Sequence, residues 1–167
     1  TQLANRELAR VAEVLAESLG GFDLIHAHDW LVAYAAVRLK HQWKLPLVAT
    51  IHATERGRCG GYLSTDLSRA INRVEDDLAS EGWRVIVTSY YMAHELITFF
   101  GEPNDKVDVI PNAVTVADFA RQPATAVATL RRRYATDDER VVFYVGRLVW
   151  EKGLHVLLEA APRILAE

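Results

Sequence analysis

Two cations lie at a predicted turn near the carboxyl end of the sequence. Arg147 follows Gly146, and Lys152 comes five residues after the arginine, ahead of a helical pattern that begins at Leu154. The start of a helix favours anions, because its N–H groups are unpaired and its dipole is positive there. A lysine at that end is unfavourable unless an anion lies beside it. The spacing therefore predicts a diphosphate site, although two exposed cations on a surface turn would give the same pattern.

Polar side chains also gather where the expected strands of the amino-terminal half end. His26, His28 and Asp29 accompany the first strand, and His52 and Glu55 follow the second. In open parallel sheets, ligands bind beyond the carboxyl ends of the strands. Convergence at one edge therefore predicts a binding site, in which a histidine such as His52 can donate to a sugar hydroxyl.

Other interpretations of these residues stay open. Alternate strand residues project to one face, so His26, His28 and Asp29 could ligate a metal, with His52 as a further ligand. A metal-dependent hydrolase is accordingly the second function class. Asp29 could instead cap the helix that follows it. Residues 54–61 mix charges with glycines, which is typical of a mobile binding loop and equally of an ordinary exposed connection.

The elements that position these residues alternate between strand and helix. Short apolar runs predict strands at residues 22–26, 47–51, 85–87, 107–110 and 141–145. Helical spacing of apolar residues predicts helices at residues 8–19, 30–43, 67–78, 92–100, 124–134 and from 154 onward. In the first helix, Leu8, Val11, Leu15 and Leu19 share one face, and Gly20 ends it. This alternation predicts the α/β class, with parallel Rossmann-like sheets covered on both faces.

The alternation breaks between residues 111 and 140, and the chain reads as three parts. We expect residues 1–110 to form part of one Rossmann-like domain, 111–140 to be a linker, and 141–167 to be the first strand–helix unit of a second domain. The sequence starts without Met inside a helical pattern and stops just after this unit. We therefore expect a fragment that is inactive by itself and prone to self-association through uncovered apolar faces and strand edges.

Composition excludes several classes of protein. Half of the 167 residues are apolar, and the net charge is −3 with a pI near 6.1, so no basic surface is expected to bind nucleic acid. Cys59 is the one cysteine, which excludes an internal disulfide and a multi-cysteine zinc site and agrees with a cytoplasmic location. The sequence lacks an apolar run of membrane-spanning length and a signal-peptide pattern.

Four motifs in order carry a resemblance to a known family. They are His-Ala-His-Asp-Trp at 26–30, Thr-Ile-His-Ala-Thr-Glu-Arg-Gly-Arg at 50–58, Ile-Pro-Asn at 110–112, and Val-Gly-Arg-Leu-Val-Trp-Glu-Lys-Gly at 145–153. Together they resemble the glycogen-synthase-like, retaining glycosyltransferases of family 4, which have the two-domain GT-B fold. The resemblance implies a nucleotide-sugar donor, ADP-glucose or UDP-glucose, in the cleft between two Rossmann-like domains.

The resemblance also implies a role for each candidate residue. Gly146, Arg147 and Lys152 match the segment that binds the donor diphosphate, and His52 matches the catalytic histidine that contacts the donor sugar. The remaining matches lie on the acceptor side of the cleft, at His28, Asp29, Glu55 and Arg58. No metal is implied, because two cations neutralise the leaving diphosphate. The implied reaction moves glucose to an α-glucan or a small sugar acceptor such as a sugar phosphate, in glucan biosynthesis. A non-catalytic sugar-binding module is a third class.

Overall fold

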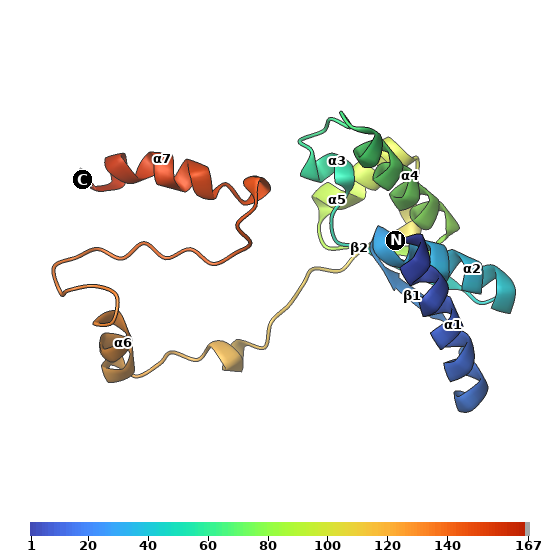
Figure 1. Ribbon diagram of the computed structural model, residues 1–167, viewed down its shortest axis with the longest axis horizontal. Helices are drawn as coiled ribbons and strands as arrows, with labels where there is room; N and C mark the ends of the chain where they lie inside the picture. Colours follow the sequence, from blue (N-terminus) through green and yellow to red (C-terminus); the bar gives the residue numbers. More distant parts are fainter. Residues whose placement is uncertain (166–167) are drawn as a thin grey trace. The chain divides into compact units, whose positions relative to one another are not determined.

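The computed structural model describes residues 1–165 and divides the chain into two units, Thr1–Ala113 and Val114–Glu167 (Figure 1). The elements of the first unit are, in chain order, α1 (Gln2–Leu19), β1 (Ile25–His28), η1 (Trp30–Val32), α2 (Ala33–Trp43), β2 (Leu47–Ile51), α3 (Glu55–Arg58), α4 (Asp66–Glu81), β3 (Arg84–Val87), α5 (Tyr90–Glu95), η2 (Leu96–Phe100), η3 (Asn104–Lys106) and β4 (Val107–Val109). Those of the second unit are η4 (Val116–Phe119), α6 (Ala124–Arg131), η5 (Trp150–Lys152) and α7 (Leu154–Leu165).

The first unit contains a parallel four-stranded sheet in the order β1-β2-β3-β4, which confirms the predicted α/β class. Strand β2 has the predicted bounds, but β1 begins three residues later than predicted. Gly20 and Gly21 have positive φ, and pairing starts where the Ile25 N–H donates to the Pro46 carbonyl at 3.0 Å. As a result, His26 and His28 both lie within the strand.

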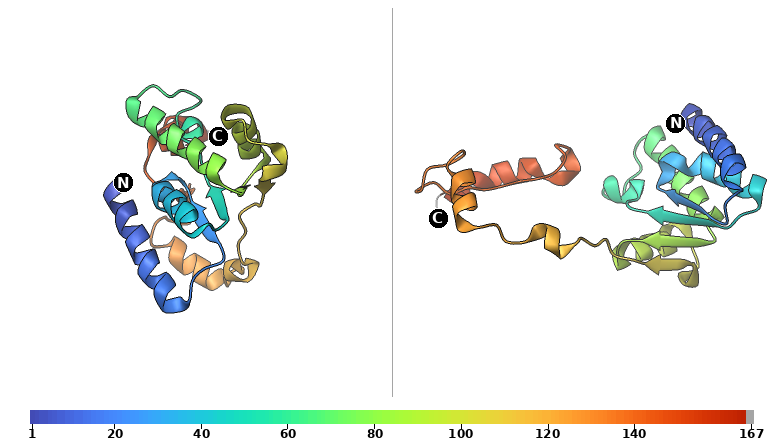
Figure 2. Two further views of the ribbon diagram at one scale, coloured as in Figure 1. Left: turned by 90° about the vertical axis from the view of Figure 1, so that its right-hand side faces the viewer. Right: turned by 90° about the horizontal axis from the view of Figure 1, so that it is seen from below.

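One face of the sheet is packed against the helices. Alternate residues of all four strands contribute to it, and α1, α2 and α4 lie side by side (Figure 2). The strand residues on this face are Ile25, Ala27, Leu47, Ala49, Ile51, Val85, Val87, Val107 and Val109. The helices α2 and α4 contribute Ala33, Ala36, Val74 and Leu78.

The prediction that both faces of the sheet are covered is wrong for residues 1–165. Among these residues, no buried apolar cluster forms on the face opposite the helices. Consecutive strands in spatial order, joined by right-handed crossovers, place every connecting helix on the same side. The opposite face therefore bears polar side chains, among them His26, Thr50, Arg84 and Asp108. Arg84 and Asp108 form a two-pronged ion pair on this face, with nitrogen–oxygen distances of 2.8 and 2.6 Å.

Helix α1 packs through a different face from the predicted one. Its leucine–valine stripe, Leu8, Val11, Leu15 and Leu19, is 41–67% exposed. The buried residues are Asn5 and Ala9. The Asn5 side chain donates to the Leu31 carbonyl at 2.7 Å and accepts from the Ala35 N–H at 2.9 Å. This amide fixes the start of α2, and small alanines then allow close helix packing. As predicted, Gly20 ends α1 in the left-handed conformation.

The second unit contains the predicted helices but not the predicted strand. Helix α6 ends at Arg131, three residues short of the prediction. Residues 141–145 do not form a strand, because the described part of the chain offers them no neighbouring strand with which to pair. None of the helices within residues 1–165 is both long and apolar enough to cross a membrane.

Candidate functional site

Three histidines and a threonine meet at the carboxyl ends of β1 and β2. His28 Nδ1 and His52 Nε2 share a hydrogen bond of 3.0 Å, and their rings stack at a centroid distance of 5.3 Å and an angle of 12°. His26 Nε2 bonds to Thr50 Oγ1 at 2.7 Å. The register explains this grouping, because His28 pairs with Thr50 across the two strands. The structure thus brings together His28 and His52, which the sequence placed at one sheet edge.

The surroundings of His26 disfavour its charged form. Partial burial lowers the pKa of His26, and the neighbouring His28 and His52 lower it further. In the His28–His52 bond one nitrogen donates and the other accepts, so the bond requires a single proton between them. A proton on both facing nitrogens would set two donors against each other. His28 therefore favours the tautomer of His52 that suits this bond.

Asp29 fixes the backbone of His52. Its Oδ1 accepts the His52 N–H at 2.8 Å, and its own N–H donates to the Thr50 carbonyl at 2.9 Å. Asp29 occupies the N-cap position of η1, but its side chain makes no cap hydrogen bond to that helix. Asp29 has φ 60° and ψ 174°, a region that only glycine adopts without strain. The carboxylate reaches His52 from this strained backbone.

Two substitutions of Asp29 should distinguish the effect of backbone strain on stability from the effect of losing the hydrogen bond to His52. Both Asp29→Gly and Asp29→Ala remove the acceptor for the His52 N–H, but only alanine keeps a Cβ in the strained conformation. We expect the glycine variant to be more stable than the alanine variant by about 1–3 kcal/mol. Urea denaturation of the two variants measures the difference. Equal midpoints and slopes would contradict a strained backbone at this position.

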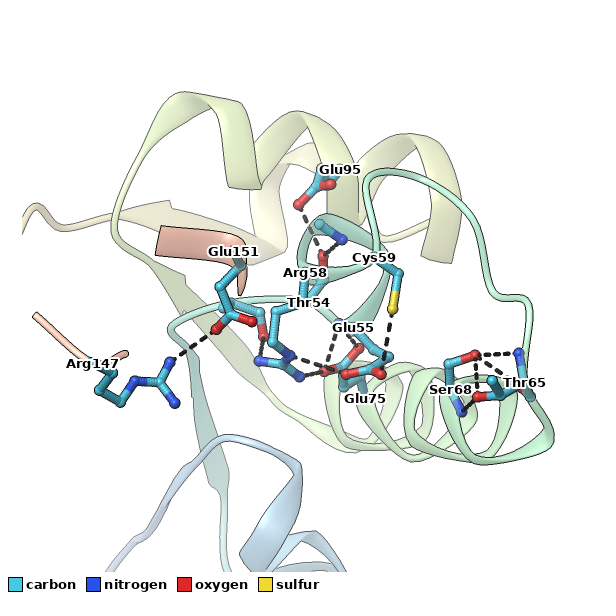
Figure 3. A network of polar contacts seen from close by, with 12 residues as sticks. Thr54, Glu55, Arg58, Cys59, Thr65, Ser68, Glu75, Glu95, Arg147 and Glu151 are labelled. Carbon is cyan, nitrogen blue, oxygen red and sulfur yellow. Dashed lines mark hydrogen bonds and ion pairs between the residues drawn. The ribbon is translucent and has the colours of Figure 1, made fainter. Parts of the chain in front are cut away.

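The segment after His52 is an ordered turn rather than the predicted loop. Thr54 Oγ1 accepts the Gly57 N–H at 2.9 Å, which caps the short helix α3, and donates to the buried Glu95 carboxylate at 3.0 Å (Figure 3). A Cβ on Gly57 would lie 3.0 Å from Thr54 Oγ1 and 3.4 Å from Glu95 Oε2. Only glycine fits this cap without displacing Thr54 or Glu95.

Glu75 of α4 is a site residue that the sequence analysis missed. Its side chain is buried, with 1% of the residue exposed, and accepts the Glu55 N–H at 2.7 and 2.9 Å and Arg58 Nη2 at 2.7 Å (Figure 3). Arg58 Nε also donates to Glu55 Oε2 at 3.0 Å. The sequence does indicate that Glu75 is buried, because it lies four residues after Ile71 and three before Leu78, on the apolar face of the helix. A carboxylate at such a position needs partners.

Burial raises the pKa of Glu75 to about 7, against the opposing effect of the Glu55 N–H and Arg58. A carboxyl group whose pKa is higher in the folded than in the unfolded state stabilises the fold when protonated. That contribution is present below pH 4.5 and is lost as the pH rises to about 7.

Glu75→Gln should therefore remove a pH-dependent part of the stability. We expect the wild-type free energy of unfolding to fall relative to the variant by on the order of 2–3 kcal/mol between pH 4.5 and 7.5. Urea titrations at intervals of half a pH unit measure both proteins. Parallel pH profiles would contradict the raised pKa. Asp77→Asn removes an exposed carboxylate of the same helix and is the matched control.

The predicted cation turn lies in the second unit, ahead of α7. Arg147 Nη2 pairs with Glu151 Oε1 at 3.0 Å (drawn in Figure 3), and Lys152 ends η5. A Cβ on Gly146 would lie 2.6 Å from the Tyr144 hydroxyl, which itself donates to the Arg147 carbonyl at 3.1 Å. A larger residue at 146 would therefore displace the tyrosine hydroxyl from this position. The turn and the helix form as predicted, without the strand before them.

The histidine arrangement does not suit the metal interpretation. Within residues 1–165, no three His, Cys, Asp or Glu side chains are grouped to hold a metal ion. His26 faces a threonine hydroxyl, His28 and His52 bond to each other, and Asp29 accepts a backbone N–H. These contacts engage one ring nitrogen of each histidine and one oxygen of the carboxylate in bonds within the protein.

Comparison with known proteins gives consistent matches. The family described as Glycosyltransferase Family 4 matches residues 2–118. The chain is 37% identical over 162 residues to an uncharacterised glycosyltransferase of Methanocaldococcus jannaschii, covering 93% of this chain and 41% of that protein. It is 40% identical over 145 residues to a glycogen synthase of Mycobacterium tuberculosis, covering 85% and 32%. It is 32% identical over 153 residues to a D-inositol 3-phosphate glycosyltransferase of Thermobifida fusca, covering 90% and 35%. The chain thus spans about a third to two fifths of these relatives.

Proposed function

The chain belongs to glycosyltransferase family 4, and from this premise we propose that it forms part of a retaining enzyme that transfers glucose from a nucleoside-diphosphate sugar to a carbohydrate acceptor. The family match spans three of the four motifs, those at 26–30, 50–58 and 110–112, and confirms the resemblance. The relatives' names include glycogen synthase and D-inositol 3-phosphate glycosyltransferase. They support an α-glucan or a small sugar phosphate as the acceptor, and ADP-glucose or UDP-glucose is the proposed donor.

The observation that carries the proposal is the fixed position of His52. Its N–H is held by Asp29 and its ring by His28, at the carboxyl end of a central strand of the sheet. An imidazole in that position can exchange hydrogen bonds with a sugar hydroxyl while its backbone stays in place. Pre-organised polar groups of this kind stabilise charge that develops in a transition state.

The donor diphosphate is assigned to the turn in the second unit. Arg147 and Lys152 supply two positive charges near the start of α7, whose unpaired N–H groups also favour an anion. They would neutralise the diphosphate as the glycosidic bond breaks, which is the work that a divalent cation performs in other transferases. In this proposal the domain carrying residues 1–110 holds the acceptor, through His28, Asp29, Glu55 and Arg58. Residues 111–140 link it to the donor domain, which begins at 141.

The test uses a full-length protein that contains this chain. ADP-glucose and UDP-glucose are each supplied with glycogen or with a sugar phosphate, and nucleoside diphosphate release is measured together with product formation. Nuclear magnetic resonance of the product at early times reports the anomeric configuration. Transfer with retention supports the proposal. Sugar binding without transfer would favour the binding module, and metal-dependent hydrolysis would favour the hydrolase.

A further inference from the structure

The ion pair of Glu75 and Arg58, called the brace below, contacts the backbone of the segment that follows His52. Glu75 accepts Arg58 Nη2 at 2.7 Å, and Arg58 Nη1 donates to the carbonyl of Ala53 at 3.2 Å (Figure 3). Ala53 is the residue next to His52. The same carboxylate accepts the Glu55 N–H, two residues further on. Glu75 therefore holds the backbone on both sides of Thr54, directly at the Glu55 N–H and through Arg58 at the Ala53 carbonyl.

His52 thus lies between two backbone anchors. On one side the Asp29 carboxylate accepts its N–H at 2.8 Å. On the other, the Glu75–Arg58 brace holds the carbonyl of Ala53. The Ala53 carbonyl is part of the peptide group between Ala53 and Thr54, so the two anchored peptide groups enclose both His52 and Ala53. Together they restrict the φ and ψ of these two residues, and with them the direction of the His52 side chain. A loosened brace would leave His52 anchored at its N–H while the peptide groups after it could rotate.

We propose that Glu75 is a positioning residue of the candidate active site, acting through Arg58 and the Ala53 carbonyl to set the orientation of His52. The proposal rests on the glycosyl-transfer function proposed above. It also gives Arg58 a role that does not require contact with the acceptor. Its side chain is 28% exposed and makes three hydrogen bonds, to Glu55, Glu75 and Ala53.

Burial supports a specific role for a carboxylate at this position. An apolar side chain would join Ile71 and Leu78 on the same helix face at no desolvation cost, whereas a buried carboxylate is costly unless it is fully paired. The groups that face Glu75 are the Glu55 carboxylate, the Arg58 guanidinium and the Cys59 thiol. Burial and the charge of Glu55 raise the pKa of Cys59, so this thiol stays protonated and adds no charge. With Glu75 titrating near pH 7, its ionised form makes an ion pair with Arg58, whereas its protonated form carries no charge to attract the guanidinium.

The first test measures the brace in this chain itself. Hydrogen exchange of the backbone amides at residues 53–58 is followed by mass spectrometry in the wild type and in Glu75→Gln. We expect exchange to be on the order of tenfold faster in the variant, because glutamine loses the charged partner of Arg58. The control Asp77→Asn should leave these amides unchanged. Arg58→Lys keeps a positive charge but lacks the fork that reaches Ala53, and it should loosen the same amides if Glu75→Gln does not fold. Unchanged protection in a folded variant of either kind would overturn the proposal.

The second test measures the consequence for transfer in a full-length protein. Glu75→Gln should lower kcat by about tenfold, leave the affinity for free nucleoside diphosphate unchanged, and remove an ionisation near pH 7 from the pH–rate profile. Asp77→Asn should change none of these. If the wild type transfers no sugar while the exchange result holds, the proposed function fails and the brace remains. If the wild type transfers sugar and Glu75→Gln matches it at every pH, the positioning role is refuted.

Discussion

Lys152→Ala, in a full-length protein that contains this chain, is expected to lower the turnover number for sugar transfer by roughly 10²–10³-fold. The ammonium group would stabilise negative charge on the departing diphosphate, and loss of one such pre-organised group costs about that factor in other enzymes. Because the stabilisation grows as the glycosidic bond breaks, kcat should fall more than the affinity for the donor. Steady-state kinetics with ADP-glucose and UDP-glucose measure both quantities.

The matched control for this variant is Arg163→Ala. Arg163 is an exposed cation in the last turn of α7, so its removal changes the net charge equally at the other end of the same helix. Arg147→Ala should resemble Lys152→Ala, since both cations act on one diphosphate, although Arg147 must also be released from Glu151. Turnover near the wild-type value in Lys152→Ala would refute the assignment of the donor site.

His52→Ala should have the second large effect, and of a different kind. We expect transfer to slow by on the order of 10²-fold while the dissociation constant of free nucleoside diphosphate changes little. The proposed role of His52 is contact with the sugar, whereas the diphosphate is assigned to Arg147 and Lys152. Isothermal titration calorimetry with the nucleoside diphosphate and initial-rate kinetics with the complete donor measure the two effects separately.

His94→Ala is the control for this histidine. His94 lies on α5, is exposed, and hydrogen-bonds only to Thr98 among the described side chains. It should leave both transfer and nucleotide binding unchanged. If His52→Ala weakens nucleotide binding and transfer by the same factor, the histidine acts on the phosphates or on the fold, and the sugar-side assignment is wrong.

Local patterns predicted the elements that depend on neighbouring residues. The apolar run 47–51 gave β2 with its observed bounds, and the helix predicted at 67–78 forms as α4, where Thr65 caps it through a reciprocal bond with Ser68. Gly20 and Gly101 end their helices in the left-handed conformation. These features are determined within a few residues, so a single sequence is enough to locate them.

Features that depend on distant residues were missed or assigned differently. Asp29 resembles a helix cap in sequence, but its carboxylate bonds to His52, the residue that follows the next strand. Glu75 is linked to Arg58 across 17 positions, and its environment exists only once α3 packs on α4. The coverage of the sheet follows from the strand order, which hydrophobic periodicity does not encode. The strand predicted at 141–145 failed for the same reason, because a strand requires a partner elsewhere in the chain.

The exposed leucine–valine stripe of α1 affects how this chain can be assayed. A contiguous apolar surface in the folded state binds environment-sensitive dyes, which ordinarily report unfolding. Dye fluorescence should therefore be high before any heating, and a thermal-shift trace would begin near its maximum fluorescence. The stability comparisons of Asp29 and Glu75 variants accordingly call for circular dichroism or intrinsic tryptophan emission. Because the same stripe is exposed in the folded chain, hydrophobic-interaction chromatography should capture the folded chain without an affinity tag.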